Sequence, residues 1–312
     1  MKPLRDLSEH PLSGIVRPVT LIEAPRLSDR LGVQVVLLSE TFQFTGSFKF
    51  RAAYRVASSV PNRTLFTASS GNFGQALAHA CRLLGKACTV VMPETSARVK
   101  IDAVREEGAT VDLIDVSRIS RQARVRELME QLPEAYFASA YDDDWVIAGN
   151  ATLGMELADL DLPVDLVVAP VGGGGLTSGI LTGLRERGNN LPVVGAEPLI
   201  GNDAARSLRE GNLVANETEP ATLADGARTV SLGLRNWEIL RDGLAGIVEV
   251  PEARIVEAIR LLFLLANLKV EPTGALAVAA VLTDPERFRT RRVCCVISGG
   301  NVDPEAFRSW IG

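Results

Sequence analysis

One lysine of the sequence lies in an apolar stretch, between Phe48 and Phe50, at the expected start of a helix. Burial disfavours the charged form of an amine, so apolar neighbours lower the pKa of a lysine. A lysine with a lowered pKa is a nucleophile that can form an imine with an aldehyde. Taken alone, a lysine in a first helical turn is more often a solvated surface residue, so Lys49 needs support from other motifs.

A polar loop after the predicted strand at residues 65–67 could bind an anion. Ser69, Ser70, Gly71 and Asn72 open a predicted helix, and the backbone N–H groups at a helix start attract a carboxylate or a phosphate. The alternative is a helix N-cap by Ser70 or Asn72 with no ligand, which is the more common use of such residues.

Four successive glycines form a second loop, after a predicted strand at residues 166–169. They are Gly172, Gly173, Gly174 and Gly175, and Leu176 follows them. Bare backbone amides at the start of a helix let a phosphate approach closely. The spacing matches neither the dinucleotide fingerprint nor the P-loop. The loop therefore indicates a site for a single phosphate monoester.

A hydroxyl group ends the last predicted strand, at residues 292–297. Ser298 could contact the ring of a ligand there, or it could simply cap the following turn.

Alternating strands and helices must position these residues. Short β-branched runs recur between helical stretches from residue 34 to residue 297, which predicts parallel sheets covered by helices on both faces. Ligands bind at the carboxyl ends of the strands in such sheets. Every candidate loop above follows a strand, so the sequence predicts that they meet in one site.

Length and composition are those of a soluble two-lobed protein. The chain has 312 residues, 46% of them hydrophobic, and a net charge of −5, which offers no basic surface for nucleic acid or an anionic membrane. The longest apolar run, residues 261–268, reads as a buried helix face. The N-terminus lacks the apolar segment of a signal peptide. Four cysteines without metal-ligand spacing indicate reduced core residues and a cytoplasmic location.

Taken together, the motifs give the chain a family resemblance. Lys49, the Ser-Gly-Asn loop, the four glycines and the final Ser-Gly-Gly-Asn stand in the order found in fold-type II pyridoxal-phosphate (PLP) enzymes. Within these, the chain resembles the serine/threonine dehydratase and serine racemase family from about Ile15 to Asp303. The resemblance implies an α/β, tryptophan synthase beta-like fold with two open parallel-sheet domains. We expect a large PLP-binding domain of residues 1–64 and 143–312, with residues 65–142 inserted as a small domain.

The resemblance also implies roles for particular residues. Lys49 would hold the cofactor and remove the Cα proton, with Ser70 as a second acid/base group. Substrate-binding residues would be Ser69, Ser70, Gly71 and Asn72. Cofactor contacts would come from Phe48, Lys49, Asn72, Gly172, Gly173, Gly174, Gly175, Leu176 and Ser298. Magnesium or calcium would bind Glu197, the carbonyl of Gly201 and Asp203, oxygen ligands of the kind these cations prefer.

The implied function is a PLP-dependent ammonia-lyase (dehydratase). It would eliminate the β-hydroxyl of L-serine/L-threonine-like amino acids to give a 2-oxo acid and ammonia. The alternative is a serine-type racemase with side elimination, because Ser70 supplies the second group that racemisation needs. A non-catalytic relative is a third possibility, which the intact Lys49 and Ser298 disfavour. The resemblance implies a homodimer.

Several positions depart from the family pattern. Phe44 replaces a residue that is often basic, Ala52 replaces the usual glycine, and Phe73 replaces the usual histidine. Tyr141 ends a short segment that differs from the one found in relatives. We expect these changes to mark a specialised substrate that is more apolar or larger than serine.

Overall fold

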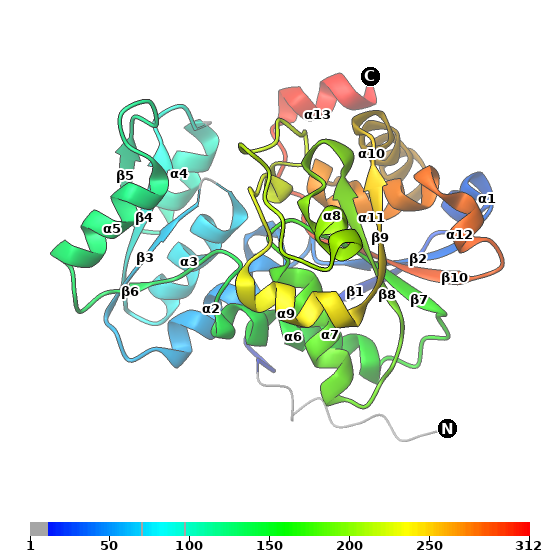
Figure 1. Ribbon diagram of the computed structural model, residues 1–312, viewed down its shortest axis with the longest axis horizontal. Helices are drawn as coiled ribbons and strands as arrows, with labels where there is room; N and C mark the ends of the chain where they lie inside the picture. The colour runs from blue at the N-terminus through cyan, green and yellow to red at the C-terminus, as the bar shows by residue number, and fades with distance from the viewer. Residues whose placement is uncertain (1–11, 70, 97) are drawn as a thin grey trace.

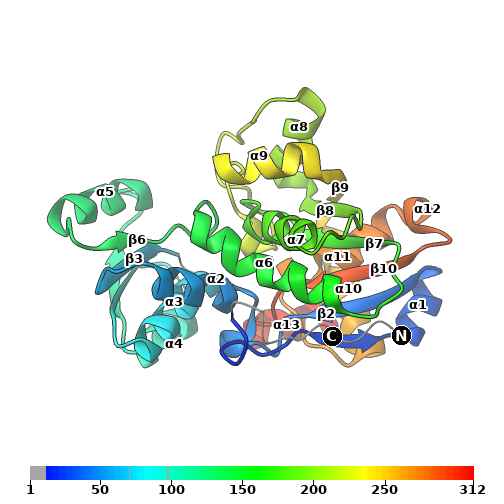
Figure 2. The same ribbon diagram turned by 90° about the horizontal axis from the view of Figure 1, so that it is seen from below.

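The computed structural model describes residues 12–69, 71–96 and 98–312, which form two sheets with helices packed against them (Figures 1 and 2). In Figure 1 the smaller sheet and helices α3, α4 and α5 lie at the left, and the larger sheet lies at the right. The predicted α/β class with two sheets is confirmed.

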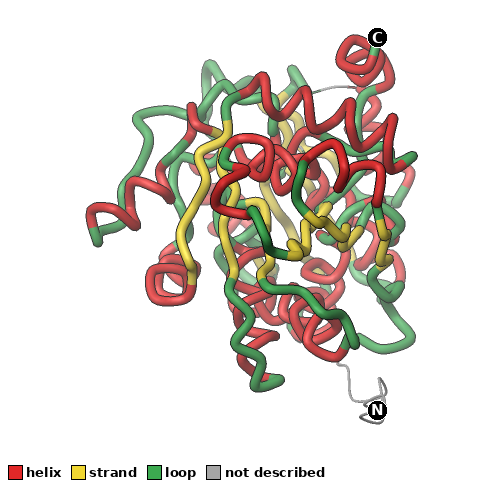
Figure 3. Tube along the Cα trace, turned by 90° about the vertical axis from the view of Figure 1, so that its right-hand side faces the viewer, coloured by secondary structure: helices red, strands yellow, loops and turns green. Residues whose placement is uncertain are grey.

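The larger sheet has six strands in the order β1-β2-β10-β7-β8-β9, and all pairs except β1–β2 are parallel. Helices cover both of its faces (Figure 3). Cys294 and Cys295 belong to the apolar clusters on opposite faces, as their adjacent positions in a strand require. The strands are β1 (Thr20–Glu23), β2 (Gln34–Ser39), β7 (Leu166–Pro170), β8 (Val193–Pro198), β9 (Leu244–Val250) and β10 (Arg292–Ile297).

The smaller sheet has four parallel strands in the order β5-β4-β3-β6. They are β3 (Thr64–Ala68), β4 (Ala87–Pro93), β5 (Thr110–Ile114) and β6 (Tyr136–Phe137). Apart from Thr64, the first residue of β3, all four strands fall within the range that the sequence predicts for an inserted domain.

Helices connect the strands in both sheets. They are α1 (Pro25–Leu31), α2 (Lys49–Ser59), α3 (Asn72–Leu83), α4 (Arg98–Glu106), α5 (Arg121–Gln131), α6 (Asp144–Asp159), α7 (Gly175–Glu186), α8 (Asp203–Glu210), α9 (Leu234–Gly243), α10 (Glu252–Ala266), α11 (Pro272–Thr283), α12 (Pro285–Phe288) and α13 (Pro304–Ile311). Short 3-10 turns are η2 (Phe44–Gly46), η3 (Leu199–Gly201) and η4 (Asp225–Ala227).

One expectation for the apolar run at residues 261–268 is wrong. Its first part belongs to α10, but Phe263 and Leu264 are exposed, while Leu262 and Leu268 are buried. Apolar residues lie on the solvent-facing side of this segment as well as on the side that packs against the core. Across the part of the chain that the structure describes, no helix is both long and apolar enough to cross a bilayer.

Candidate active site

Two segments far apart in the sequence place Lys49 at the carboxyl end of β10. Ser47 forms an antiparallel bridge with Gly299, and the N–H of Phe48 donates to the carbonyl of Ser298 over 3.0 Å. Helix α2 begins at Lys49 immediately afterwards. The lysine stretch and the final Ser-Gly-Gly-Asn loop are therefore joined, as the strand order predicts.

Helix α2 is held in place by a buried arginine that the sequence reasoning did not identify. Arg51 is fully buried and pairs through Nε with Glu40 at 2.8 Å and through Nη1 with Glu156 at 2.6 Å. These carboxylates raise the pKa of Arg51 despite its burial, so it stays charged. The three groups fix the first turn of the helix that carries Lys49.

The amine of Lys49 lies in a largely apolar environment. Nζ donates to the carbonyl of Ala140 over 2.7 Å and lies 5.0 and 5.6 Å from the ring centroids of Phe48 and Phe73. Burial lowers the pKa of Lys49 to about 8, an effect that the negative charge of Glu271 partly opposes. A substantial fraction of the amine is therefore neutral near physiological pH and able to act as a nucleophile.

Only one of the two phenylalanines adjacent in sequence contributes to this environment. Phe50 turns away and packs on Phe44 and His79, each 5.3 Å away between ring centroids. Successive helical residues point in different directions, so a sequence neighbour need not be a spatial neighbour. Phe73, from α3, takes that place. The departure at Phe44 therefore concerns the packing of α2 on α3, and the one at Phe73 concerns Lys49 itself.

Asn72 links the two lobes through a carboxylate. Its amide donates to both oxygens of Glu271, at 2.8 and 3.0 Å, and its own oxygen accepts from Nδ2 of Asn301 at 2.9 Å. Burial, with a further contribution from the nearby charge of Asp225, raises the pKa of Glu271 to about 8. Sequence reasoning assigned Glu271 no role, and its position directly before a helix N-terminus was the available signal.

The four glycines follow β7 and lead directly into α7. Gly174 has a φ of +93°, in the left-handed region that favours glycine. A Cβ on Gly173 would lie 2.3 Å from the ring of Tyr141, and one on Gly172 would lie 2.8 Å from the carbonyl of Gly226. The loop is thus closely surrounded, and side chains at these positions would displace its neighbours.

Two residues outside the predicted set hold the glycine loop. Nδ2 of Asn236 donates to the carbonyls of Gly173, at 2.8 Å, and Tyr141, at 2.9 Å. Leu176, in the first turn of α7, is buried in the core beneath the loop. Tyr141, which the sequence showed only as a departure, therefore lies at the proposed phosphate site.

Ser298 is fully buried, and its hydroxyl has no hydrogen-bond partner among the described residues. The hydroxyl of Ser47, next to it through the bridge, also lacks one. Buried hydroxyls without partners are costly, and such a group at the end of a strand calls for an explanation. A ligand with a ring nitrogen is one. The glycine cradle, the lysine with its lowered pKa and this hydroxyl fit a phosphorylated pyridine aldehyde.

The substrate loop is only partly described. Ser70 lies outside the described residues. Oγ of Ser69 accepts a 3.3 Å hydrogen bond from the N–H of Gly71, which directly precedes α3. The carbonyl of Ser69 lies against Gly74, where a Cβ would approach it to 2.6 Å.

The predicted metal ligands are close together, but they are partly engaged. Both oxygens of Glu197 accept from backbone N–H groups at the start of α8, those of Ala204 and Ala205, at 2.9 Å each. Oδ1 of Asp203 accepts from Asn216 at 2.9 Å, whereas its buried Oδ2 has no partner in the described part of the chain. Within that part, no group of three or more His, Cys, Asp and Glu side chains could hold a metal.

Comparisons with known proteins agree with this geometry. The family model described as pyridoxal-phosphate dependent enzyme matches residues 12–299. An L-threo-3-hydroxyaspartate ammonia-lyase from Pseudomonas sp is 37% identical over 302 residues, covering 96% of this chain and 94% of the relative. Serine racemase from Mus musculus is 35% identical over 298 residues, covering 92% and 86%. The crystal structure of a threonine deaminase from T.th. superposes with a TM-score of 0.88 at 38% identity, covering 94% of this chain and 95% of that one.

The chain therefore belongs to the family of pyridoxal-phosphate-dependent enzymes. Its fold is that of the fold-type II members, and the predicted cofactor is pyridoxal 5′-phosphate. The predictions of the family, of the fold and of a lyase of the dehydratase type are confirmed.

Proposed function

We propose that Lys49 both attaches the cofactor and removes the Cα proton of the substrate. The observation that carries the proposal is its buried Nζ, whose pKa is about 8 and which lies between Phe48 and Phe73 at the carboxyl end of the sheet. Once freed from the cofactor, this amine has a pKa suited to accepting a proton near neutral pH. Pyridoxal phosphate supplies an electron sink for the carbanion that this proton loss leaves.

The other cofactor contacts follow from their positions. Gly172 to Gly175 would hold the phosphate with backbone N–H groups at the start of α7. Phe48 and Asn72 would contact the ring and its 3-hydroxyl, and Ser298 would give its unpartnered hydroxyl to the ring nitrogen. Ser298 is uncharged, so it does not hold a proton on that nitrogen as a carboxylate would. This favours rapid loss of a β-leaving group.

The reaction that these residues support best is elimination from a β-hydroxy amino acid. Ser69, Gly71 and Asn72 surround the start of α3, where the substrate carboxylate would bind. The β-hydroxyl leaves after proton loss at Cα, and hydrolysis yields a 2-oxo acid and ammonia. Ser70 would face Cα opposite Lys49. This keeps racemisation open as a second activity, supported by the likeness to serine racemase.

We propose an acidic substrate of the 3-hydroxyaspartate type. An L-threo-3-hydroxyaspartate ammonia-lyase is among the most similar relatives. Arg121, the first residue of α5, is close enough to Tyr141 to oppose the rise that burial causes in the pKa of that phenol, and it pairs with Glu219 on the opposite lobe. A second carboxylate on the substrate could replace Glu219 there. Arg121→Gln should then lower kcat/KM for L-threo-3-hydroxyaspartate much more than kcat/KM for L-threonine. An equal loss for both would refute the assignment.

We also propose a divalent cation at Glu197, Gly201 and Asp203. Two buried carboxylates close together, one with an unpartnered oxygen, support it. A cation at 100 times its dissociation constant adds about 2.7 kcal/mol of stability. For 312 residues this corresponds to roughly 4 °C in Tm. A chelator should lower Tm by about that much in the wild type and have no effect in Asp203→Ala. An unshifted wild-type Tm would count against the site.

We propose a homodimer, on the family resemblance, and sedimentation of the holoenzyme tests it. Four buried, free cysteines support a reducing compartment such as the cytoplasm.

The test of the central proposal is the substitution Lys49→Ala. It should abolish the absorbance band of the covalently attached cofactor and both activities, whereas Lys86→Ala, at a lysine bound to the carbonyl of Val60, should retain them. An unchanged spectrum in Lys49→Ala would refute the attachment. Ser70→Ala should remove racemisation and spare elimination, and loss of both together would contradict its separate role.

A further inference from the structure

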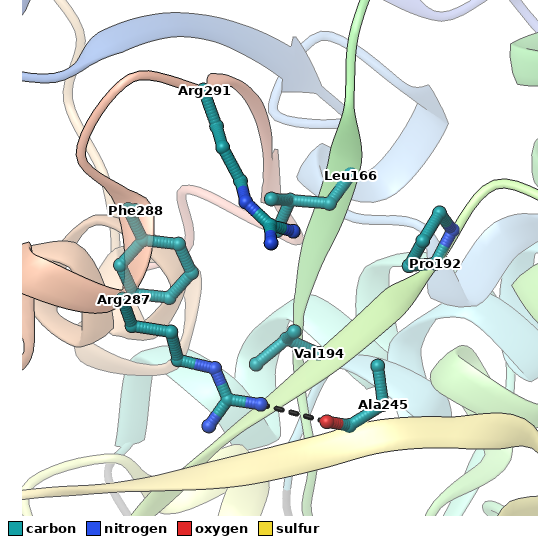
Figure 4. Close-up of a pocket in the computed structure, with 7 residues that line it drawn as sticks. All are labelled: Leu166, Pro192, Val194, Ala245, Arg287, Phe288 and Arg291. Atoms are coloured by element: carbon teal, nitrogen blue, oxygen red, sulfur yellow. Dashed lines mark hydrogen bonds between the residues drawn. The ribbon is translucent and has the colours of Figure 1, made fainter.

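A second cavity lies at the opposite end of the large sheet from Lys49. It has a volume of about 280 Å³ and is lined by Leu166, Pro192, Val194, Ala245, Arg287, Phe288 and Arg291 (Figure 4). Leu166 is the first residue of β7, and the glycine loop lies just beyond the last residue of that strand. Five residues of strand separate the two sites by roughly 16 Å.

The floor of this cavity is apolar, and its charged groups are two arginines. Figure 4 shows both guanidinium groups turned toward the strands that carry Leu166, Val194 and Ala245. Nη2 of Arg287 donates to the carbonyl of Ala245 at 2.7 Å, which fixes the side chain. For the side chain of Arg291, the described residues provide neither an ion pair nor a hydrogen bond.

Local backbone irregularities shape this cavity. Between the pairs Val193–Leu244 and Gly195–Ile247, β9 contains one more residue than β8, so it bulges at Ala245 and Gly246. The bulge leaves the Ala245 carbonyl for Arg287, and a Cβ on Gly246 would lie 2.7 Å from that guanidinium.

The second irregularity precedes Arg291. Thr290 has a φ of +65°, which is unfavourable for a β-branched residue. A strained residue of this kind persists only where the surroundings impose it, and it is a reason to look for a function. Arg291 follows this turn; the residue is exposed, and its side chain lines the cavity.

The charge of the cavity decides the class of ligand. None of the seven lining residues is acidic. The nearest carboxylates in the sequence are engaged elsewhere: Glu286 pairs with Arg289 at 2.5 Å, and Asp165 accepts from the N–H of Arg292 at 2.6 Å. An amino acid would bring an ammonium group with no partner in the cavity. A carboxylate with an uncharged apolar chain fits, because the arginines can bind the carboxylate and the apolar floor can contact the chain.

We propose that this cavity binds a 2-oxo acid, the class of product that the enzyme releases. The charge of the cavity selects a carboxylate, and only the choice of a 2-oxo acid among carboxylates rests on the proposed function. A product bound at the amino ends of β7 and β8 occupies the strands whose other ends carry the glycine loop and Glu197. The site is thus placed to report product concentration to the catalytic lobe.

The test is calorimetric titration of the holoenzyme with 2-oxobutanoate, which requires no turnover. Arg291→Gln should weaken binding at this site at least about tenfold, the effect of one charge-assisted hydrogen bond. Arg289→Gln, at an arginine that is exposed like Arg291 but does not line the cavity, should leave it within about twofold. Binding of L-2-aminobutanoate, which belongs to the catalytic site, should be the same in all three proteins.

Two results would overturn the proposal. One is equal affinity for 2-oxobutanoate in the wild type and Arg291→Gln, which would place all binding at the catalytic site. The other is wild-type binding weaker than about 10 mM. Because kcat and KM of Arg291→Gln are measured separately, a failure of the proposed reaction would appear in turnover and not in this titration.

Discussion

Replacing Ser298 by alanine should stabilise the cofactor-free protein and weaken cofactor binding. The Ser298 hydroxyl is fully buried and has no partner among the described residues. An unsatisfied buried hydroxyl costs about 1–3 kcal/mol, part of which is offset by the small space that alanine leaves. We therefore expect Ser298→Ala to raise the free energy of unfolding of the apoprotein by about 1 kcal/mol.

If the hydroxyl contacts the cofactor as proposed, the substitution also removes a hydrogen bond from the holoenzyme, worth roughly 0.5–1 kcal/mol. A thermodynamic cycle then requires a loss of cofactor affinity equal to the sum of the two effects, about 1.5–2 kcal/mol, or roughly 10- to 30-fold in Kd. Urea unfolding of both forms and titration of the apoprotein with cofactor measure all three sides of this cycle independently.

Ser207→Ala is the matched control. Ser207 is equally buried, but its hydroxyl donates to the carbonyl of Asp203 at 2.6 Å and accepts from the N–H of Val214 at 2.8 Å. Its loss should destabilise the apoprotein and the holoenzyme by similar amounts and leave the cofactor Kd unchanged. If Ser298→Ala instead destabilised both forms equally, Ser298 would be a structural residue and the ring contact would be wrong.

Three further predictions concern the residues around Lys49. The rate of cofactor attachment to the apoprotein should rise with pH with a midpoint at about 8, because only the neutral amine attacks and burial lowers the pKa of Lys49 to about 8. A midpoint near 10.5 in stopped-flow absorbance would contradict this. Gly173→Ala should lower cofactor affinity by at least tenfold, since the added Cβ would lie 2.3 Å from the Tyr141 ring. If this variant bound the cofactor as tightly as the wild type, the loop would have adapted to the side chain. Arg51→Met should destabilise the protein by about 3–5 kcal/mol in urea unfolding, because both carboxylates that pair with Arg51, Glu40 and Glu156, lose their buried cation. A change below about 1 kcal/mol would mean that these acids become neutral at little cost.

The sequence predicted the strands and loops well because local patterns determine them. The strands at residues 110–114 and 292–297 have the predicted bounds, and the other predicted strands differ by one or two residues at one or both ends. β1, β6 and β9 were missed. β6 is only two residues long, and β9 is interrupted by the bulge at Ala245 and Gly246. Neither offers the regular run of alternating or apolar residues on which the prediction depends.

The sequence predicted the parts of the site that follow strand ends, because glycines, hydroxyl residues and one lysine are recognisable there. The long-range contacts of the site were not predicted. Asn72 and Glu271 are 199 positions apart, and Lys49 and the carbonyl of Ala140 are 91 apart. No local pattern specifies such a pair. The lowered pKa of Lys49 was expected for a reason that is half correct, because Phe50 faces another cluster and Phe73 replaces it.

The two titratable groups buried at the site are driven toward neutrality in opposite directions. Burial lowers the pKa of Lys49 and raises that of Glu271, each to about 8. Since each would stabilise the charge of the other, an event that charges one favours charging its neighbour. If Lys49 accepts the Cα proton as proposed, its new positive charge would be favoured by an ionised Glu271, which Asn72 already holds with two hydrogen bonds. On this proposal, Glu271 would support the basicity of Lys49 at the moment of proton transfer. Asn72, through Asn301, connects this charge to the loop that carries Ser298.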